Sequence, residues 1–309
     1  MTARPYGATV RWDASGRPPV HPDSPRRARR VIAALLASAT VLVLSGCSET
    51  VQRGWLPGDS DQEVTDQTGR VVSLWVGSWI AALIVGIITW GLILWCVAVY
   101  RKRKDDDTLP VQLRYHVPLE VMYVLLPIVM VGVLFYYTNR DTMAMQDTSA
   151  EPDVNIQVVG KQWSWDFNYL DEDVYETGQH ARNVGEDPEA LDRQVTLYLP
   201  VDQRVEFTLD ARDVNHSFWV PEFLYKMDMI PGVTNVFQVT PTREGVYRGK
   251  CAELCGEEHS SMLFNVAVVS QEEYDAHMEE LREKGQTGAL SLEYSRQHDL
   301  HEVAGEDEN

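Results

Sequence analysis

Residues 71–100 read VVSLWVGSWIAALIVGIITWGLILWCVAVY, an uncharged run of 30 residues bounded by Arg70 and Arg101. About 20 apolar residues cross the hydrocarbon core of a bilayer as a helix, so this run is long enough to span it with tilt or overhang. Tryptophans lie towards both ends, as interfacial anchors do. The run therefore predicts a transmembrane helix, and a buried core helix of this length without a charge is disfavoured.

A second uncharged run covers residues 121–137 and contains Pro127. It is shorter, but neighbouring helices can absorb a proline break within a membrane. The connection between the runs contains Arg101-Lys102-Arg103-Lys104, and such a basic cluster marks the cytoplasmic side. The sequence therefore predicts a two-span hairpin over residues 71–140, with both of its ends outside the cytoplasm.

The N-terminal region has the features of an export signal. Four arginines within residues 26–30 precede an apolar run over residues 31–44, which is too short to span a bilayer but suits a signal-peptide core. The run ends Leu44-Ser45-Gly46-Cys47, which resembles a bacterial lipobox, whose cysteine is lipidated and becomes the mature N-terminus. We expect residues 1–46 to be removed and Cys47 to carry lipid, leaving 47–70 as an extracytoplasmic segment. The alternative is a short internal helix with an incidental cysteine.

Charge is distributed unevenly along the chain. From residue 139 onward there are 13 basic and 35 acidic residues, a net charge of −22, whereas residues 1–138 carry +3. An acidic domain repels phosphates, which disfavours nucleic-acid binding and favours a basic protein partner. Four cysteines in a chain of 309 residues do not make a disulfide scaffold.

Beyond the hairpin, the sequence changes to short alternating segments bounded by Pro, Gly, Asn or Asp, a pattern typical of an antiparallel sandwich or barrel. We expect residues 141–285 to form an exterior all-β domain, interrupted by an exposed acidic insertion over 171–194. Ser270 and Glu273 form a capping-box pattern that predicts a helix to about residue 284. Residues 286–309 are expected to be an acidic, mobile tail. The expected strands cover residues 154–159, 162–169, 194–199, 204–209, 233–239, 245–249 and 263–269.

One stretch carries metal-binding chemistry: Cys251-Ala-Glu253-Leu-Cys255-Gly-Glu-Glu-His259-Ser-Ser-Met262. A further histidine, His216, lies 35 residues upstream. Soft cysteine and methionine ligands select copper, and two histidines with a cysteine and a weak methionine are the blue-copper pattern. Because a thiolate can bridge two metals, the second cysteine suits a binuclear copper centre.

The residue types alone leave other interpretations of this stretch open. The two cysteines alone are equally compatible with a structural disulfide in an oxidising exterior. Zinc would use the cysteines and histidines but has little use for a thioether. The combination of all five side chains favours copper. Cys96 is expected to serve packing in the first span, and His298 and His301 are expected to be solvated.

With these motifs in place, the chain resembles subunit II of cytochrome c oxidase, a member of the haem–copper superfamily, over about residues 70–285. The resemblance rests on the hairpin, the exterior domain and the loop pattern C-x-E-x-C-x₃-H-x₂-M. It implies a cupredoxin-like exterior barrel or sandwich that holds the binuclear CuA centre. The implied ligands are bridging Cys251 and Cys255, one histidine per copper (His216 and His259), and weak axial Met262 and the Glu253 carbonyl.

The family also implies a function, partners and a location. The chain would be an enzyme subunit that takes electrons from cytochrome c, or from a complex containing one, on the outer face of the bacterial cell membrane. It would pass them to haem and copper groups in subunit I, where oxygen is reduced to water with proton pumping; subunit III is a further expected partner. The Glu253 side chain would reach a magnesium or manganese ion at the subunit I boundary.

Three further residues carry roles by the same resemblance. Trp163, in Gly160-Lys-Gln-Trp-Ser-Trp-Asp-Phe-Asn-Tyr169, matches the position where electrons enter, although aromatic residues on a strand are otherwise core. Asp213 matches an acidic docking position for the donor, although carboxylates are commonplace in this domain. Glu120 matches a cytoplasmic proton entrance, and the alternative is a carboxylate that merely lies at the membrane interface.

Two features of the sequence depart from the family pattern, and three other functions would use some of the same motifs. Val233 stands where many relatives have arginine, and the insertion could alter donor docking in favour of a cytochrome held in a fixed complex. A copper-free quinol oxidase subunit II is disfavoured by the intact ligand set. A tethered copper carrier would need exchangeable, exposed ligands. A CuA domain serving nitrous oxide reduction would share the loop, but the hairpin with Glu120 favours the oxidase.

Overall fold

The computed structural model describes residues 33, 48–58, 62–100, 113–184 and 192–292. The chain divides into two compact units, residues 1–52 and 53–309. The first contains the short helix α2 (Glu49–Gln52), and the second contains all the elements discussed below. Cys47, the basic cluster 101–104, His298 and His301 lie outside the described residues, as does the expected signal peptide apart from residue 33.

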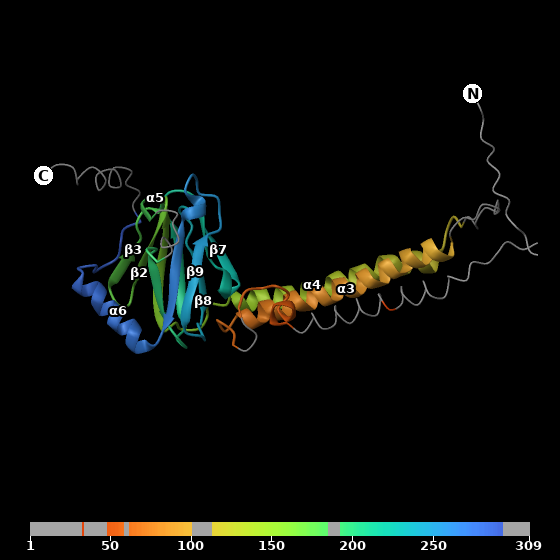
Figure 1. Ribbon diagram of the computed structural model, residues 1–309, viewed down its shortest axis with the longest axis horizontal. Coiled ribbons are helices and arrows are strands. Elements are labelled where there is room, and N and C mark those ends of the chain that lie inside the picture. Colours follow the sequence, from red (N-terminus) through yellow and green to blue (C-terminus); the bar gives the residue numbers. More distant parts are fainter. Residues whose placement is uncertain (1–32, 34–47, 59–61, 101–112, 185–191, 293–309) are drawn as a thin grey trace, which may run out of the picture. The chain divides into compact units, whose positions relative to one another are not determined.

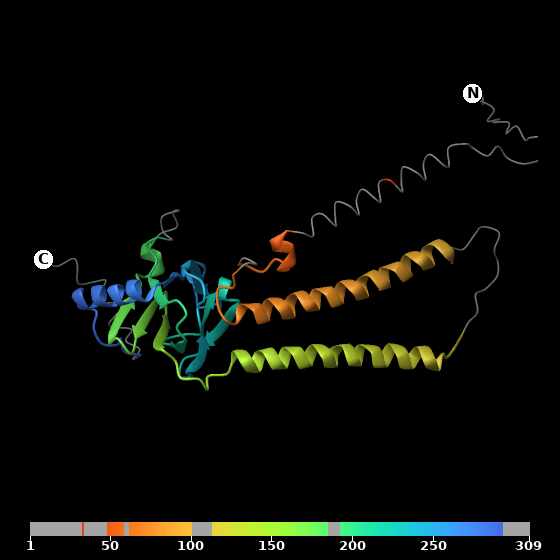
Figure 2. The same cartoon turned by 90° about the horizontal axis from the view of Figure 1, so that it is seen from below.

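Two long helices, α3 (Thr68–Val99) and α4 (Val117–Met145), are apolar enough to cross a membrane. Figure 2 shows them running alongside each other. Their apolar side chains are exposed along most of their length, as expected for helices that lipid surrounds. The two predicted apolar helices are confirmed, and Pro127 does not end α4. The helix α4 also continues past the uncharged run, where Asp141 pairs with Arg140 at 2.8 Å.

The exterior domain is a sandwich of two five-stranded sheets, as the sequence predicts (Figure 1). The sheet orders are β3-β2-β1-β5-β8 and β4-β10-β9-β6-β7. Most neighbours are antiparallel, but β1 pairs with β5, and β4 with β10, in parallel. The strands are β1 (Val154–Lys161), β2 (Ser164–Tyr169), β3 (Val174–Thr177), β4 (Thr196–Pro200), β5 (Val205–Ala211), β6 (His216–Val220), β7 (Tyr225–Met229), β8 (Asn235–Val239), β9 (Gly245–Cys251) and β10 (Leu263–Val269).

Aromatic side chains from both sheets fill the space between them. The ring of Phe264 lies 4.9 Å from that of Trp165 and 5.1 Å from that of Phe218, measured between centroids. Phe264 pairs across the strands with Gly249. A Cβ atom on Gly249 would lie 2.1 Å from the Phe264 ring, so only glycine leaves room for it. The core of the sandwich therefore extends directly beneath the end of β9, where the metal-binding stretch begins.

The insertion differs from the expectation of an exposed loop. It contains β3, which adds to the edge of β2, and a short helix, α5 (Ala181–Val184). Val174 is fully buried and Ala181 is 5% exposed. The prediction was wrong for this part because a four-residue strand among acidic residues leaves almost no periodicity to detect.

The C-terminal helix α6 (Gln271–Glu283) begins with the predicted capping box between Ser270 and Glu273. The helix packs against β3 and β4. The expectation of a mobile tail from residue 286 is wrong for its first residues: Tyr175 donates to the carbonyl of Gln286, and Leu290 donates to Asn168. These hydrogen bonds hold the start of the tail against β3 and β2 of the first sheet.

The segment before α3 is also attached to the domain. The Thr242 N–H donates to the Val64 carbonyl at 2.9 Å, and the Asp66 N–H donates to the Thr240 carbonyl at 3.0 Å. Val64 is 2% exposed and belongs to the hydrophobic core. The segment that leads into α3 is therefore joined to the sandwich by backbone hydrogen bonds.

Candidate metal centre

The metal-binding stretch joins two neighbouring strands at one end of the sandwich. Cys251 is the last residue of β9, and its neighbour across the sheet is Phe218 of β6. His216 begins β6. The loop after Cys251 leads into a 3₁₀ turn, η3 (His259–Ser261), and Met262 directly precedes β10. Sheet pairing thus brings His216 next to residues that lie 35 or more positions away in sequence.

The candidate ligands converge on the two cysteine sulfurs. The Sγ atoms of Cys251 and Cys255 lie 3.8 Å apart, and the Cys251 Sγ lies 3.1 Å from the Glu253 carbonyl oxygen. The remaining distances are 3.8 Å from Cys251 Sγ to His216 Nδ1, 3.6 Å from Cys255 Sγ to His259 Nδ1, and 3.8 Å from Cys255 Sγ to Met262 Sδ. All six predicted residues therefore lie around one point, within a single chain.

The chemistry of the donor set fits copper. Both cysteines are free and buried, so the disulfide alternative does not describe this structure. His216 is fully buried and Met262 is 1% exposed, which excludes water from the inner side of the site. Two thiolates, two imidazoles and a thioether are soft or intermediate ligands, as copper requires.

The contact between the two thiols moves their pKa values apart. Cys255 donates a hydrogen bond that lowers the pKa of Cys251 to about 3 against the effect of burial, with help from His216 and the Ser217 N–H. The same contact, together with burial, raises the pKa of Cys255. The two sulfurs therefore differ in acidity, and binding of a metal by both releases the protons that they carry.

Asp213 fixes the orientation of His216. Its Oδ1 lies 2.8 Å from His216 Nε2, and its Oδ2 accepts the Gln162 N–H at 2.6 Å. Burial opposes ionisation, but hydrogen bonds from His216 and from the N–H groups of Gln162 and Val214 lower the pKa of Asp213. An ionised acceptor at Nε2 leaves Nδ1, which faces Cys251, with its lone pair free for a metal. The Asp213 side chain is only 11% exposed.

This arrangement predicts the effect of removing the carboxylate. Asp213→Ala is expected to weaken copper binding by about 10- to 100-fold, because partners behind a metal-ligating histidine typically contribute that much. Copper affinity of the purified full complex, measured by competition with a chelator, tests this. An unchanged affinity would contradict the positioning role of Asp213.

Trp163 lies against the loop that holds the ligands. Its Nε1 donates to the Cys255 carbonyl at 3.2 Å, and Gln162 Nε2 donates to the same oxygen at 2.7 Å. Gly256 has φ of +128°, and a Cβ atom there would lie 2.8 Å from Trp163. Trp165 and Phe167, in contrast, are fully buried in the core. Trp163 is partly exposed, so it connects the surface with the metal-binding loop.

Gln162 was not identified from the sequence, although the quoted aromatic segment contains it. Its contacts reach Asp213 and Cys255, which lie 51 and 93 positions away. The fold brings these three residues together, and no local sequence pattern indicates the contacts that Gln162 makes.

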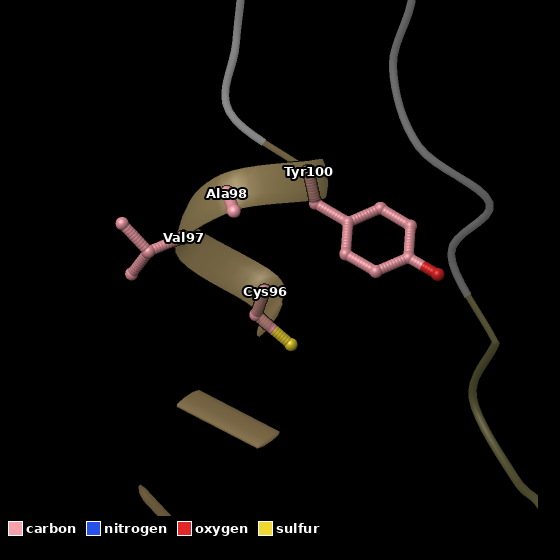
Figure 3. Close-up of a pocket in the computed structure, with 4 residues that line it drawn as sticks. All are labelled: Cys96, Val97, Ala98 and Tyr100. Atoms are coloured by element: carbon pink, nitrogen blue, oxygen red, sulfur yellow. The ribbon is translucent and has the colours of Figure 1, made fainter. Parts of the chain in front are cut away.

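Other candidate residues lie apart from the centre. Glu120 accepts the His116 N–H at 2.9 Å in the first turn of α4. Cys96 is exposed on α3 instead of packed within the chain, and it lines a pocket with Val97, Ala98 and Tyr100 (Figure 3). Among the residues that the structure describes, one helix end lines this pocket and offers a lone thiol, so it adds nothing to the metal centre.

Comparisons with known proteins match most of the chain. The family model "Cytochrome C oxidase subunit II, periplasmic domain" matches residues 154–269. A "Probable cytochrome c oxidase subunit 2" of Streptomyces avermitilis is 43% identical and covers 86% of this chain and 91% of its own length. A "Cytochrome c oxidase subunit 2" of Mycobacterium bovis is 32% identical, with coverages of 94% and 92%. The crystal structure of the periplasmic domain of subunit II of cytochrome oxidase of Bradyrhizobium japonicum is 29% identical, with a TM-score of 0.40, and covers 44% of this chain and 97% of that one.

Proposed function

This chain belongs to the cytochrome c oxidase subunit II family, and we propose that it holds the binuclear copper centre at which electrons enter the oxidase. It would accept electrons from a cytochrome c outside the cell membrane and pass them to the haem and copper groups of subunit I. Oxygen is reduced to water there, coupled to proton pumping. The observation that carries the proposal is the convergence of His216, Cys251 and Cys255, whose ligand atoms all lie within 4.8 Å of one another.

The protein would hold the metal with Cys251 and Cys255 as bridging ligands. His216 and His259 would each bind one copper, with Met262 and the Glu253 carbonyl as weak ligands. When bound, the copper pair would supply one-electron uptake and release without forming a bond to a substrate. The strands β6, β9 and β10 fix the ligands at three points, which limits their movement when the charge of the site changes.

Trp163 supports a route for electrons from the surface. Its indole N–H donates to the carbonyl of Cys255, a proposed ligand, so a hydrogen bond joins the partly exposed ring directly to the site. The net charge of −22 from residue 139 onward would attract a basic haem protein. The Asp213 carboxylate is largely buried and accepts three hydrogen bonds, so we assign it to positioning His216. We assign docking of the electron donor to the acidic surface as a whole.

The loop also offers a contact to a partner subunit. Leu254 is 75% exposed between Cys251 and Cys255, and the Glu253 side chain next to it is exposed as well. We propose that this edge faces subunit I and that Glu253 binds a magnesium or manganese ion there, with subunit III as a further member of the complex. The two spans would place the domain on the extracytoplasmic side, attached to the membrane by lipid on Cys47 too.

Glu120 would serve proton uptake at the cytoplasmic end of α4. Glu120→Gln is expected to slow oxygen turnover while leaving the copper absorption spectrum unchanged, because glutamine keeps the helix-capping hydrogen bond and loses only the ionisable group. Turnover of the purified complex, with the spectrum of the same sample as control, checks this. Native turnover in the variant would remove the proton role.

The rival functions differ in the structure they require. A quinol oxidase subunit II has no use for a complete ligand set, and a copper carrier needs exposed ligands, whereas His216, Cys251 and Met262 are buried. Rapid mixing of the native complex with reduced cytochrome c tests the proposal. The near-infrared copper absorption is expected to bleach before the haems become reduced. Haem reduction without this change would contradict the proposal.

A further inference from the structure

We propose that Arg182 of the insertion is a positioning residue, which holds the segment Glu257–His259 of the metal-binding loop in place. The inference rests on the copper site proposed above and extends it to a residue that lies 75 positions before Glu257 in the sequence. It also gives the insertion a role, although none of the predicted copper ligands lies in the insertion.

Arg182 forms two ion pairs with the metal-binding loop. Its Nη2 lies 3.0 Å from Glu257 Oε2, and its Nε lies 3.1 Å from Glu258 Oε1. The guanidinium is a planar fork, so two simultaneous contacts fix direction as well as distance. The residue that follows Glu258 is His259, whose Nδ1 faces Cys255 at 3.6 Å. The arginine therefore fixes the backbone immediately before a proposed ligand.

The insertion supports Arg182 firmly. The Ala181 N–H donates to the Trp163 carbonyl at 2.8 Å, and the His180 ring packs edge-on against Trp163 at 5.5 Å. The Gly178 N–H donates to the Trp165 carbonyl at 2.8 Å. Because β2 holds Trp165, the residues before Arg182 are attached to the sheet that carries the sandwich core.

The two proposed histidine ligands differ in how they are supported. His216 is buried within a strand and oriented by Asp213. His259 is half-buried in a single 3₁₀ turn, and Gly256, with its positive φ, lies three residues before it. Backbone hydrogen bonds within the loop, from His259 to the Gly256 carbonyl and from Ser261 to the Glu258 carbonyl, hold the turn itself. Contacts from outside the loop are needed to fix the position of this turn relative to the sheets. Arg182 supplies such a contact.

The expected effect of removing Arg182 is modest because both of its ion pairs are partly exposed to solvent. The side chains of Arg182 and Glu257 are 58% and 74% exposed, and that of Glu258 is 20% exposed. Ion pairs of this kind contribute little individually, so we expect the loss of both to change loop opening by about fivefold. The measurement therefore needs a control with equivalent charge chemistry elsewhere.

Arg282 provides that control. It also forms two ion pairs, with Glu172 at 2.7 Å and Glu279 at 3.2 Å, at 37% exposure and on α6. In the purified oxidase complex, Arg182→Gln is expected to speed copper loss to a chelator by about fivefold, whereas Arg282→Gln changes it by less than about twofold. Hydrogen exchange of the loop amides in the copper-free complex is expected to show the same contrast.

Equal effects of the two substitutions on both measurements would overturn the role of Arg182. Hydrogen exchange separates this outcome from a failure of the proposed function. If the native complex held no copper, the proposed copper site would be refuted. Faster hydrogen exchange at Glu257–His259 in Arg182→Gln, but not in Arg282→Gln, would still establish that Arg182 holds this segment in place.

Discussion

Cys255→Ser is expected to remove the binuclear copper signal and to lower oxygen consumption with cytochrome c as donor by more than about 100-fold. Substitutions behind metal ligands already cost about 10- to 100-fold, and Cys255 is a proposed bridging ligand itself. A serine hydroxyl stays protonated near neutral pH and is a hard donor, so it cannot bridge two copper ions. Cys255 Sγ also lies within 3.8 Å of Cys251, His259 and Met262, and all three contacts change with it.

Copper content and oxygen uptake of the purified complex measure this effect. Cys96→Ser is the matched control, because it makes the same chemical change at a free cysteine on α3, away from the centre. The control is expected to keep native copper content and turnover. Retention of both by Cys255→Ser as well would contradict the ligand assignment.

Gly249→Ala is expected to destabilise the exterior domain by about 3 kcal/mol, the upper part of the usual range for overpacking a core. The new Cβ atom would lie 2.1 Å from the Phe264 ring, which cannot move without displacing Trp165 and Phe218. For a domain of this size, such a loss lowers the unfolding temperature by about 6–10 °C. Thermal unfolding of the full chain, followed by tryptophan fluorescence, reports the change.

Two further variants show whether the clash is the cause. Val246→Ala lies on the same strand at a 69% exposed position, and it is expected to change stability by less than about 0.5 kcal/mol. Phe264→Leu combined with Gly249→Ala is expected to be less destabilised than the sum of the single changes, because the smaller side chain relieves the contact. Strict additivity would show that the ring is not what excludes a side chain at residue 249.

Much of the fold was predictable because it depends on local sequence. The spans follow from long uncharged runs, and the α6 capping box from two residues three positions apart. Strand β6 was missed because four of its five residues are buried, so the strand lacks the alternation that marks a half-buried strand. The parallel pairing of β1 with β5 was also missed, since it joins segments separated by three other strands.

The candidate metal centre was also predictable only in its local part. The ligands from Cys251 to Met262 lie on one loop, and their residue types alone indicate copper. The roles of Gln162 and Arg182 arise from contacts between residues 51 to 93 positions apart, which the sequence does not show. Asp213 illustrates the limit: its position before His216 is visible in the sequence, but its burial and its three hydrogen bonds are not.

Electron paramagnetic resonance of the oxidised native complex tests the central claim most directly. The account predicts the hyperfine pattern of one unpaired electron shared equally between two copper nuclei, and its absence from the Cys255→Ser complex. A signal from a single isolated copper, or a complex free of copper with Cys251 and Cys255 joined in a disulfide, would contradict it.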